Sequence, residues 1–154
     1  MKKLLGVILL TLFIMSVTSL PAMGTSTEWF HKYGILLDDS LNYIYFYFGV
    51  NADINLSETL MITPEANIFV RPICKVIYFE PAVLLQLKVK NVFFGAGPMK
   101  LFRVAGDKLI PEFWGLKLNF GMWLHNMRIR LMTFSPFDNL FKDNYIAAQV
   151  GFAF

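Results

Sequence analysis

Eight ionisable side chains are the residues of this sequence that could do chemistry together. They fall on one side of segments whose alternating pattern predicts β-strands. Three carboxylates and five cations in this arrangement could form a buried network of ion pairs, or could line a narrow polar pathway for ions or small solutes. The eight residues are Asp53, Glu65, Arg71, Glu80, Lys88, Lys117, Arg128 and Arg130.

The residues that usually carry catalysis or bind metal ions are scarce. Two histidines, His31 and His125, and one cysteine, Cys74, are too few for a convergent acid–base or metal site. Ser135 has no histidine neighbour in the strand order proposed below. No glycine loop followed by Lys-Ser or Lys-Thr is present to hold a phosphate. We therefore expect no catalytic residues, no cofactor and no metal site.

The composition indicates a membrane protein. Of the 154 residues, 56% are hydrophobic and only 16% are charged, whereas about 25% are charged in an average soluble domain. This balance excludes intrinsic disorder, and a single cysteine excludes a disulfide framework. The length predicts one domain.

The first 24 residues are typical of a secretory signal peptide. Two lysines precede an apolar run over residues 4–15, and a small-x-small triplet ends at Gly24. We predict cleavage after Gly24, export through the Sec pathway and a mature domain over 25–154; an uncleaved membrane anchor is the alternative. The mature net charge falls from +3 to +1, which gives no electrostatic reason to expect nucleic acid as a partner.

No later segment is suited to cross a bilayer as a helix. A spanning helix needs about 20 apolar residues, and the longest charge-free stretch of the mature chain covers residues 40–52, which is 13 residues. That stretch contains Tyr-Ile-Tyr-Phe-Tyr-Phe, a β-forming sequence. Apart from a helix, only a closed β-barrel can cross a bilayer with all its backbone N–H and C=O groups hydrogen-bonded. The sequence therefore favours a barrel.

Alternation of apolar and polar residues predicts the strands. From Tyr43 to Leu56 one side of the chain is wholly apolar and the other carries every polar group. Segments 113–125 and 145–154 alternate similarly, and the weakest case is 29–37. The polar side carries Tyr, Phe, Trp and Gly rather than the Lys, Glu and Thr of a soluble sandwich, which favours an enclosed lumen. Tyr43, Tyr45 and Tyr47 form an inward stripe that fills the lumen or binds a ligand.

Three short turns divide the mature chain into four hairpins and therefore eight strands. The tight turns are expected on the periplasmic side and the more polar links outside. Pro64, Pro81 and Pro98 fall within strands, where each deletes a hydrogen bond and marks a bulge or a place where the strand leaves the membrane. The tight turns are Ser57-Glu58, Lys90-Asn91 and His125-Asn126, and the hairpins cover 25–57, 58–90, 91–125 and 126–154.

The final strand carries the most specific motif, an alternating apolar segment with an aromatic carboxyl terminus. The chain resembles the small eight-stranded outer-membrane β-barrels, the OmpA/OmpX/OmpW-like group. The resemblance implies an outer-membrane location in contact with lipid, and it implies that the final strand is the signal read by the barrel-assembly machinery. The residues of this signal are Tyr145, Val150, Phe152 and Phe154.

The expected fold is an all-β, closed, antiparallel up-and-down transmembrane β-barrel of about eight strands. The expected protein is a monomeric, integral outer-membrane barrel with a structural or interaction role, or with minor porin-like passage of solutes. The alternatives are a secreted soluble β-barrel that binds a small hydrophobic ligand, and a membrane-embedded lipid-modifying enzyme.

Overall fold

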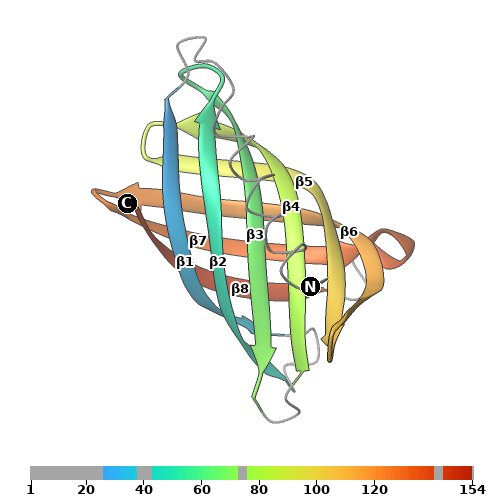
Figure 1. Ribbon diagram of the computed structural model, residues 1–154. Coiled ribbons are helices and arrows are strands. Elements are labelled where there is room, and N and C mark those ends of the chain that lie inside the picture. The colour runs from blue at the N-terminus through green and yellow to red at the C-terminus, as the bar shows by residue number, and fades with distance from the viewer. Residues whose placement is uncertain (1–25, 38–42, 73–75, 141–143, 154) are drawn as a thin grey trace.

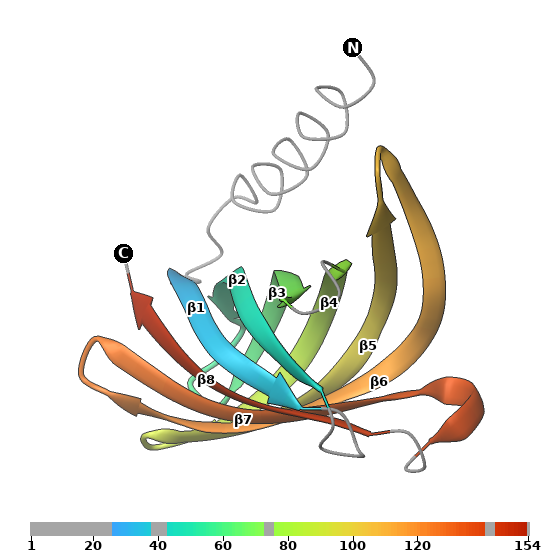
Figure 2. The same cartoon turned by 90° about the horizontal axis from the view of Figure 1, so that it is seen from below.

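The chain forms a closed barrel of eight antiparallel strands in sequence order (Figure 1). The computed structural model describes residues 26–37, 43–72, 76–140 and 144–153. Strand β8 pairs with β1 to close the sheet, and Figure 2 shows these two strands side by side. The predicted all-β, closed, antiparallel barrel of eight strands is therefore confirmed. The elements are β1 (Thr27–Leu37), β2 (Ile44–Asn55), β3 (Leu60–Arg71), β4 (Val76–Val89), β5 (Val92–Ala105), β6 (Lys108–Leu124), β7 (Met127–Pro136), the short 3-10 helix η1 (Phe137–Asn139) and β8 (Tyr145–Ala153).

The connections at one end of the barrel are two to four residues long, whereas the other end combines the short β5–β6 turn with longer links from β1 to β2 and from β7 to β8. The three tight turns join β2 to β3, β4 to β5 and β6 to β7 where the sequence predicted them. Lys90 and His125 begin two of these turns with φ values of 55° and 56°, in the left-handed region that closes a two-residue hairpin. We call this side the tight-turn end and the opposite side the loop end. The predicted signal peptide (1–24), Cys74 and Phe154 lie outside the described residues.

Side chains alternate between an apolar outer face and a filled interior. Phe46 and Phe48 are 46% and 44% exposed, whereas Tyr47 between them is fully buried. The first strand, whose alternation is the weakest in the sequence, behaves in the same way, because Tyr33 and Ile35 point outward while Lys32 is buried. Over the described ranges no helix is long and apolar enough to span a membrane.

The three strand prolines keep their places in the sheet without a bulge. Pro64, Pro81 and Pro98 lie inside β3, β4 and β5, and the register is the same on both sides of each. Cross-strand pairing is interrupted beside each proline on one flank, as a missing N–H requires. The expected bulges are therefore wrong at these positions. The described sheet shifts register instead between Leu101 and Phe102, which leaves Glu112 as an extra residue of β6.

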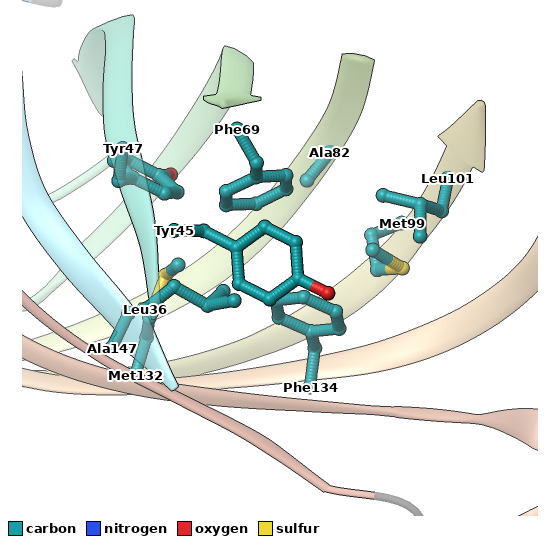
Figure 3. Packing of buried hydrophobic residues seen from close by; sticks show 10 residues of the cluster. All are labelled: Leu36, Tyr45, Tyr47, Phe69, Ala82, Met99, Leu101, Met132, Phe134 and Ala147. Atoms are coloured by element: carbon teal, nitrogen blue, oxygen red, sulfur yellow. The ribbon is translucent and has the colours of Figure 1, made fainter. Parts of the chain in front are cut away.

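An apolar cluster fills the interior toward the loop end. Figure 3 shows Tyr45 among Phe69, Phe134 and Met99, with side chains from separate strands meeting inside the barrel. Tyr47 and Phe69 have ring centroids 4.8 Å apart, and Phe69 and Phe134 are 5.7 Å apart. Rings at these separations pack favourably, so this cluster joins opposite sides of the sheet. The buried members are Leu36, Tyr45, Tyr47, Phe69, Ala82, Met99, Leu101, Met132, Phe134 and Ala147.

Gly97 allows strand β5 to approach β4 closely, and we expect it to tolerate no side chain. A Cβ at this position would collide with the carbonyl oxygen of Val83 and lie 2.8 Å from the Cα of Leu84. Gly97→Ala should lower stability by about 1–3 kcal/mol, as overpacking does, measured by urea unfolding in lipid vesicles. Gly151→Ala is the control, because its nearest neighbour would lie at 3.3 Å. Equal unfolding midpoints for the two variants would contradict the close approach.

Candidate functional site in the barrel lumen

Glu65 is the hub of the charged side chains inside the barrel. Its Oε2 lies 2.7 Å from Lys117 Nζ and 3.2 Å from Lys32 Nζ, and its Oε1 accepts a hydrogen bond from Arg130. These three cations come from β6, β1 and β7, while Glu65 itself lies on β3. One carboxylate therefore ties together strands from all around the barrel.

Glu80 forms the second acidic position beside this hub. Lys117 Nζ lies 3.1 Å from both of its carboxylate oxygens, and Asn67 Nδ2 donates a hydrogen bond of 2.7 Å to Oε2. Lys117 also lies 3.4 Å from the Tyr47 hydroxyl. The ammonium group thus bridges two carboxylates on adjacent strands, which would otherwise repel one another.

A second ion pair lies nearer the tight-turn end. Arg128 donates to Asp53, and Asp53 Oδ1 also accepts hydrogen bonds of 2.8 Å from Thr63 and from Asn51. The Arg128 guanidinium lies 4.5 Å from the ring centroid of Phe30 and 4.8 Å from that of Phe93. Aromatic faces attract a guanidinium, so rings and carboxylate together fix its position.

The network is enclosed by the sheet. The side chains of its ion pairs are no more than 2% exposed. Buried charges need partners because water no longer solvates them, and here the partners come from six of the eight strands. The arrangement is suited to filling and fixing the barrel interior. Its members are Lys32, Asp53, Glu65, Glu80, Lys117, Arg128 and Arg130, which we call the lumen network.

The lumen network contains six of the eight ionisable residues singled out in the sequence, and it leaves out Arg71 and Lys88. Arg71 ends β3, and its guanidinium lies 3.3 Å from the ring centroid of Tyr43 at the loop end. Lys88 lies near the end of β4, with its Nζ 5.0 Å from the ring centroid of Trp123 at the tight-turn end. These two cations lie at opposite ends of the barrel because each is close to the end of its strand, whereas the lumen network lies between the two ends.

Lys32 is the network member that the sequence analysis missed. Its strand has the weakest alternation, since His31 shares the outward side with Tyr33 and Ile35. The sequence did contain a signal for Lys32, because it alternates with Tyr33 and Ile35 and should therefore point to the opposite, inward side. The amides of Asn51 and Asn67 were also not singled out, although they lie on the same inward side as the carboxylates to which they donate hydrogen bonds.

The other candidate residues are placed apart from the lumen network. Ser135 lies at the loop end and donates to the backbone oxygen of Asn139 at 3.2 Å. His125 lies in a tight turn, and His31 lies in the half of β1 near that end. Among the residues with described placement, no three His, Cys, Asp or Glu side chains gather to hold a metal ion.

The predicted assembly signal runs along β8. Tyr145 starts the strand and stacks on Phe134 at 4.8 Å between ring centroids. Phe152 is exposed on the outer face, and Val150 is partly exposed there. The tyrosine stripe divides in a similar way, because Tyr45 and Tyr47 are buried whereas Tyr43 is 42% exposed.

Comparison with known proteins identifies the fold. No protein-family model matches the sequence, and no curated protein is significantly similar to it. Among solved structures, a de novo designed transmembrane β-barrel superposes with a TM-score of 0.60 at 7% identity, over 82% of this chain and 95% of that one. Another design, TMB2.3, gives a TM-score of 0.52 at 16% identity, over 82% of this chain and 92% of that one.

A natural protein has the same architecture. The crystal structure of Neisserial surface protein A (NspA) matches with a TM-score of 0.53 at 10% identity, over 85% of this chain and 97% of that one. At these identities the likeness concerns the fold alone. The chain therefore has the fold of the small eight-stranded outer-membrane barrels.

Proposed function

We propose that this protein is a monomeric, integral outer-membrane β-barrel with a structural or interaction role. The observation that carries the proposal is the distribution of polarity, which is the reverse of that in a soluble domain. Charged side chains form pairs inside the barrel, while large apolar side chains cover its outside. A bilayer is the solvent that suits this distribution.

The apolar outer face extends around the whole barrel. Soluble proteins rarely expose a continuous apolar patch of more than a few hundred Å², so a secreted soluble barrel would be a poor match to this surface. Every strand contributes at least one large side chain that is more than a third exposed. Examples in strand order are Ile35, Phe46, Ile68, Leu85, Phe94, Phe120, Leu131 and Ile146.

The filled lumen favours a structural role over the passage of solutes. Eight strands leave an interior just wide enough for side chains. Here Tyr47, Phe69 and Phe134 are packed beside the lumen network, and all three rings are buried. A lipid-modifying enzyme is less well supported, because Ser135 lies at the opposite end of the barrel from His125.

Export through the Sec pathway and recognition by the barrel-assembly machinery complete the proposal. They rest on the sequence of residues 1–24 and on Tyr145, Val150, Phe152 and Phe154. A closed sheet has no free edge strand for pairing with another copy, which supports a monomer.

The test is expression in a bacterium with two membranes, followed by fractionation. We expect the protein in the outer-membrane pellet after a carbonate wash, shortened by 24 residues, with different gel mobilities before and after boiling. Planar-bilayer recording of the same sample should show no steady conductance steps. Extraction by carbonate, or equal mobility of boiled and unboiled samples, would overturn the membrane assignment. Steady conductance steps would instead favour solute passage.

A further inference from the structure

A cavity of about 180 Å³ occupies the loop end of the lumen. Every one of the eight strands contributes a side chain to its wall, so the closed barrel builds it as a whole. Aromatic rings make up most of this wall, and we call the space the aromatic cavity. The rings belong to Tyr45, Phe69, Tyr78, Phe113, Phe134 and Tyr145.

Three of these rings lie in nearly parallel planes. Phe134 and Tyr145 are stacked, with centroids 4.8 Å apart and an interplanar angle of 13°. Phe113 continues the series at 6.4 Å and 19° from Tyr145. Tyr45 and Tyr78 meet at a steeper angle of 66° and come from strands on the other side of the barrel. The wall is therefore built from aromatic rings in several orientations.

The register shift in β6 brings a carboxylate to the same cavity. Glu112 is the extra residue at this shift, and it lines the cavity together with its neighbour Phe113. Consecutive residues of a regular strand point to opposite faces, and a bulge changes that direction. Arg103 Nε lies 2.8 Å from Glu112 Oε1, so the carboxylate is already compensated. The wall thus contains polar atoms, but its one carboxylate is already paired, so the cavity has no charge that would favour a charged ligand.

We propose that the aromatic cavity binds one small, uncharged aromatic molecule that carries a hydroxyl group. The size fits this class, since an apolar cavity of about 150 Å³ is enough for benzene. Ring–ring contacts add affinity beyond simple burial of apolar area, so the wall should prefer an aromatic guest to a saturated one of equal size. The proposal depends on the barrel fold and is independent of the membrane in which the barrel lies.

Phenol and cyclohexanol are matched probes for this site, because they share a hydroxyl group and a six-membered ring. The experiment titrates each into the refolded chain in detergent micelles and follows methyl resonances by NMR. Phenol should shift Leu36 and Leu101, which line the cavity, in a saturable manner. Cyclohexanol should bind about fivefold more weakly. Shifts that rise without saturation and affect outward-facing Leu131 equally would show mere partition into the micelle and overturn the proposal, as would equal affinities.

Two ring substitutions separate the cavity from the rest of the barrel. Phe134→Leu removes one of the stacked rings of the wall and should weaken phenol binding at least fivefold, whereas Phe120→Leu, on the outer face, should leave it unchanged. If Phe134→Leu does not fold, Leu101→Phe fills the cavity from a different strand and should abolish the saturable shifts at Leu36. Unchanged phenol binding in a folded Phe134→Leu or Leu101→Phe protein would contradict the site.

Discussion

Glu65→Gln should be the most damaging conservative substitution in this barrel, lowering the free energy of unfolding by about 3–5 kcal/mol. The change keeps the shape of the side chain and removes the charge that faces Lys32, Lys117 and Arg130. These cations would remain enclosed with one carboxylate fewer, and an uncompensated buried charge is costly. Urea unfolding in lipid vesicles, followed by tryptophan fluorescence, measures the loss.

Glu112→Gln is the matched control for this substitution. Glu112 also forms an ion pair, with Arg103 at 2.8 Å, but its side chain is 33% exposed whereas that of Glu65 is fully buried. An exposed pair is typically worth less than about 1 kcal/mol, so this variant should unfold almost like the unaltered protein. If the two variants lose the same stability, the lumen network does not fix the barrel.

A double variant addresses the case in which Glu65→Gln fails to fold at all. Combining it with Arg130→Met removes one cation along with the carboxylate, and it should recover part of the folded fraction seen on unboiled gels. No recovery would mean that the hydrogen bonds of Glu65 matter more than its charge.

Leu131→Arg should also be strongly destabilising, because it places a charge on the outer face at the middle of β7. Leu131 is 54% exposed and lies beside Arg130 of the lumen network. An arginine at the bilayer midplane of a barrel costs about 2–4 kcal/mol, and the cost falls to about 0–1 kcal/mol near the interfaces. We expect a corresponding fall in stability in vesicles, measured by urea unfolding.

Leu109→Arg provides the comparison for this prediction. Leu109 is 55% exposed, but it lies near the tip of the β5–β6 hairpin, which projects beyond the other strands in Figure 2. Exposure is therefore equal, and only the distance from the middle of the barrel differs. A soluble barrel would tolerate both arginines, so equal and small effects would exclude a lipid-facing outer surface.

The alternation of side chains was enough to predict most of the fold. Residues such as Phe46 and Phe48 on one parity and Tyr47 on the other define two faces without any knowledge of neighbouring strands. The tight turns were equally local, since Lys90-Asn91 and His125-Asn126 each join two alternating segments directly. Strand number follows from these local signals, and closure was predicted from the expectation of a membrane, which permits no open sheet edge.

The candidate site was predictable as a set of inward charges but not as a set of pairs. Parity placed Glu65, Lys117 and Arg130 on the same face, yet they lie 52 and 65 residues apart in the chain. Alternation also could not show that Arg71 and Lys88 lie at the ends of the barrel, away from the lumen network. The position of a side chain along the barrel axis depends on how neighbouring strands are staggered, and the sequence of a single strand does not contain this information.

The sequence by itself therefore determined which side of each strand faces outward and which is enclosed, because the period of two is a property of the isolated strand. The tertiary structure alone decided which charges meet, where the β6 register shifts, and that eight strands build an aromatic cavity at the loop end. These features depend on contacts across the barrel between residues far apart in the chain. Such contacts exist only after the sheet has closed with one particular stagger.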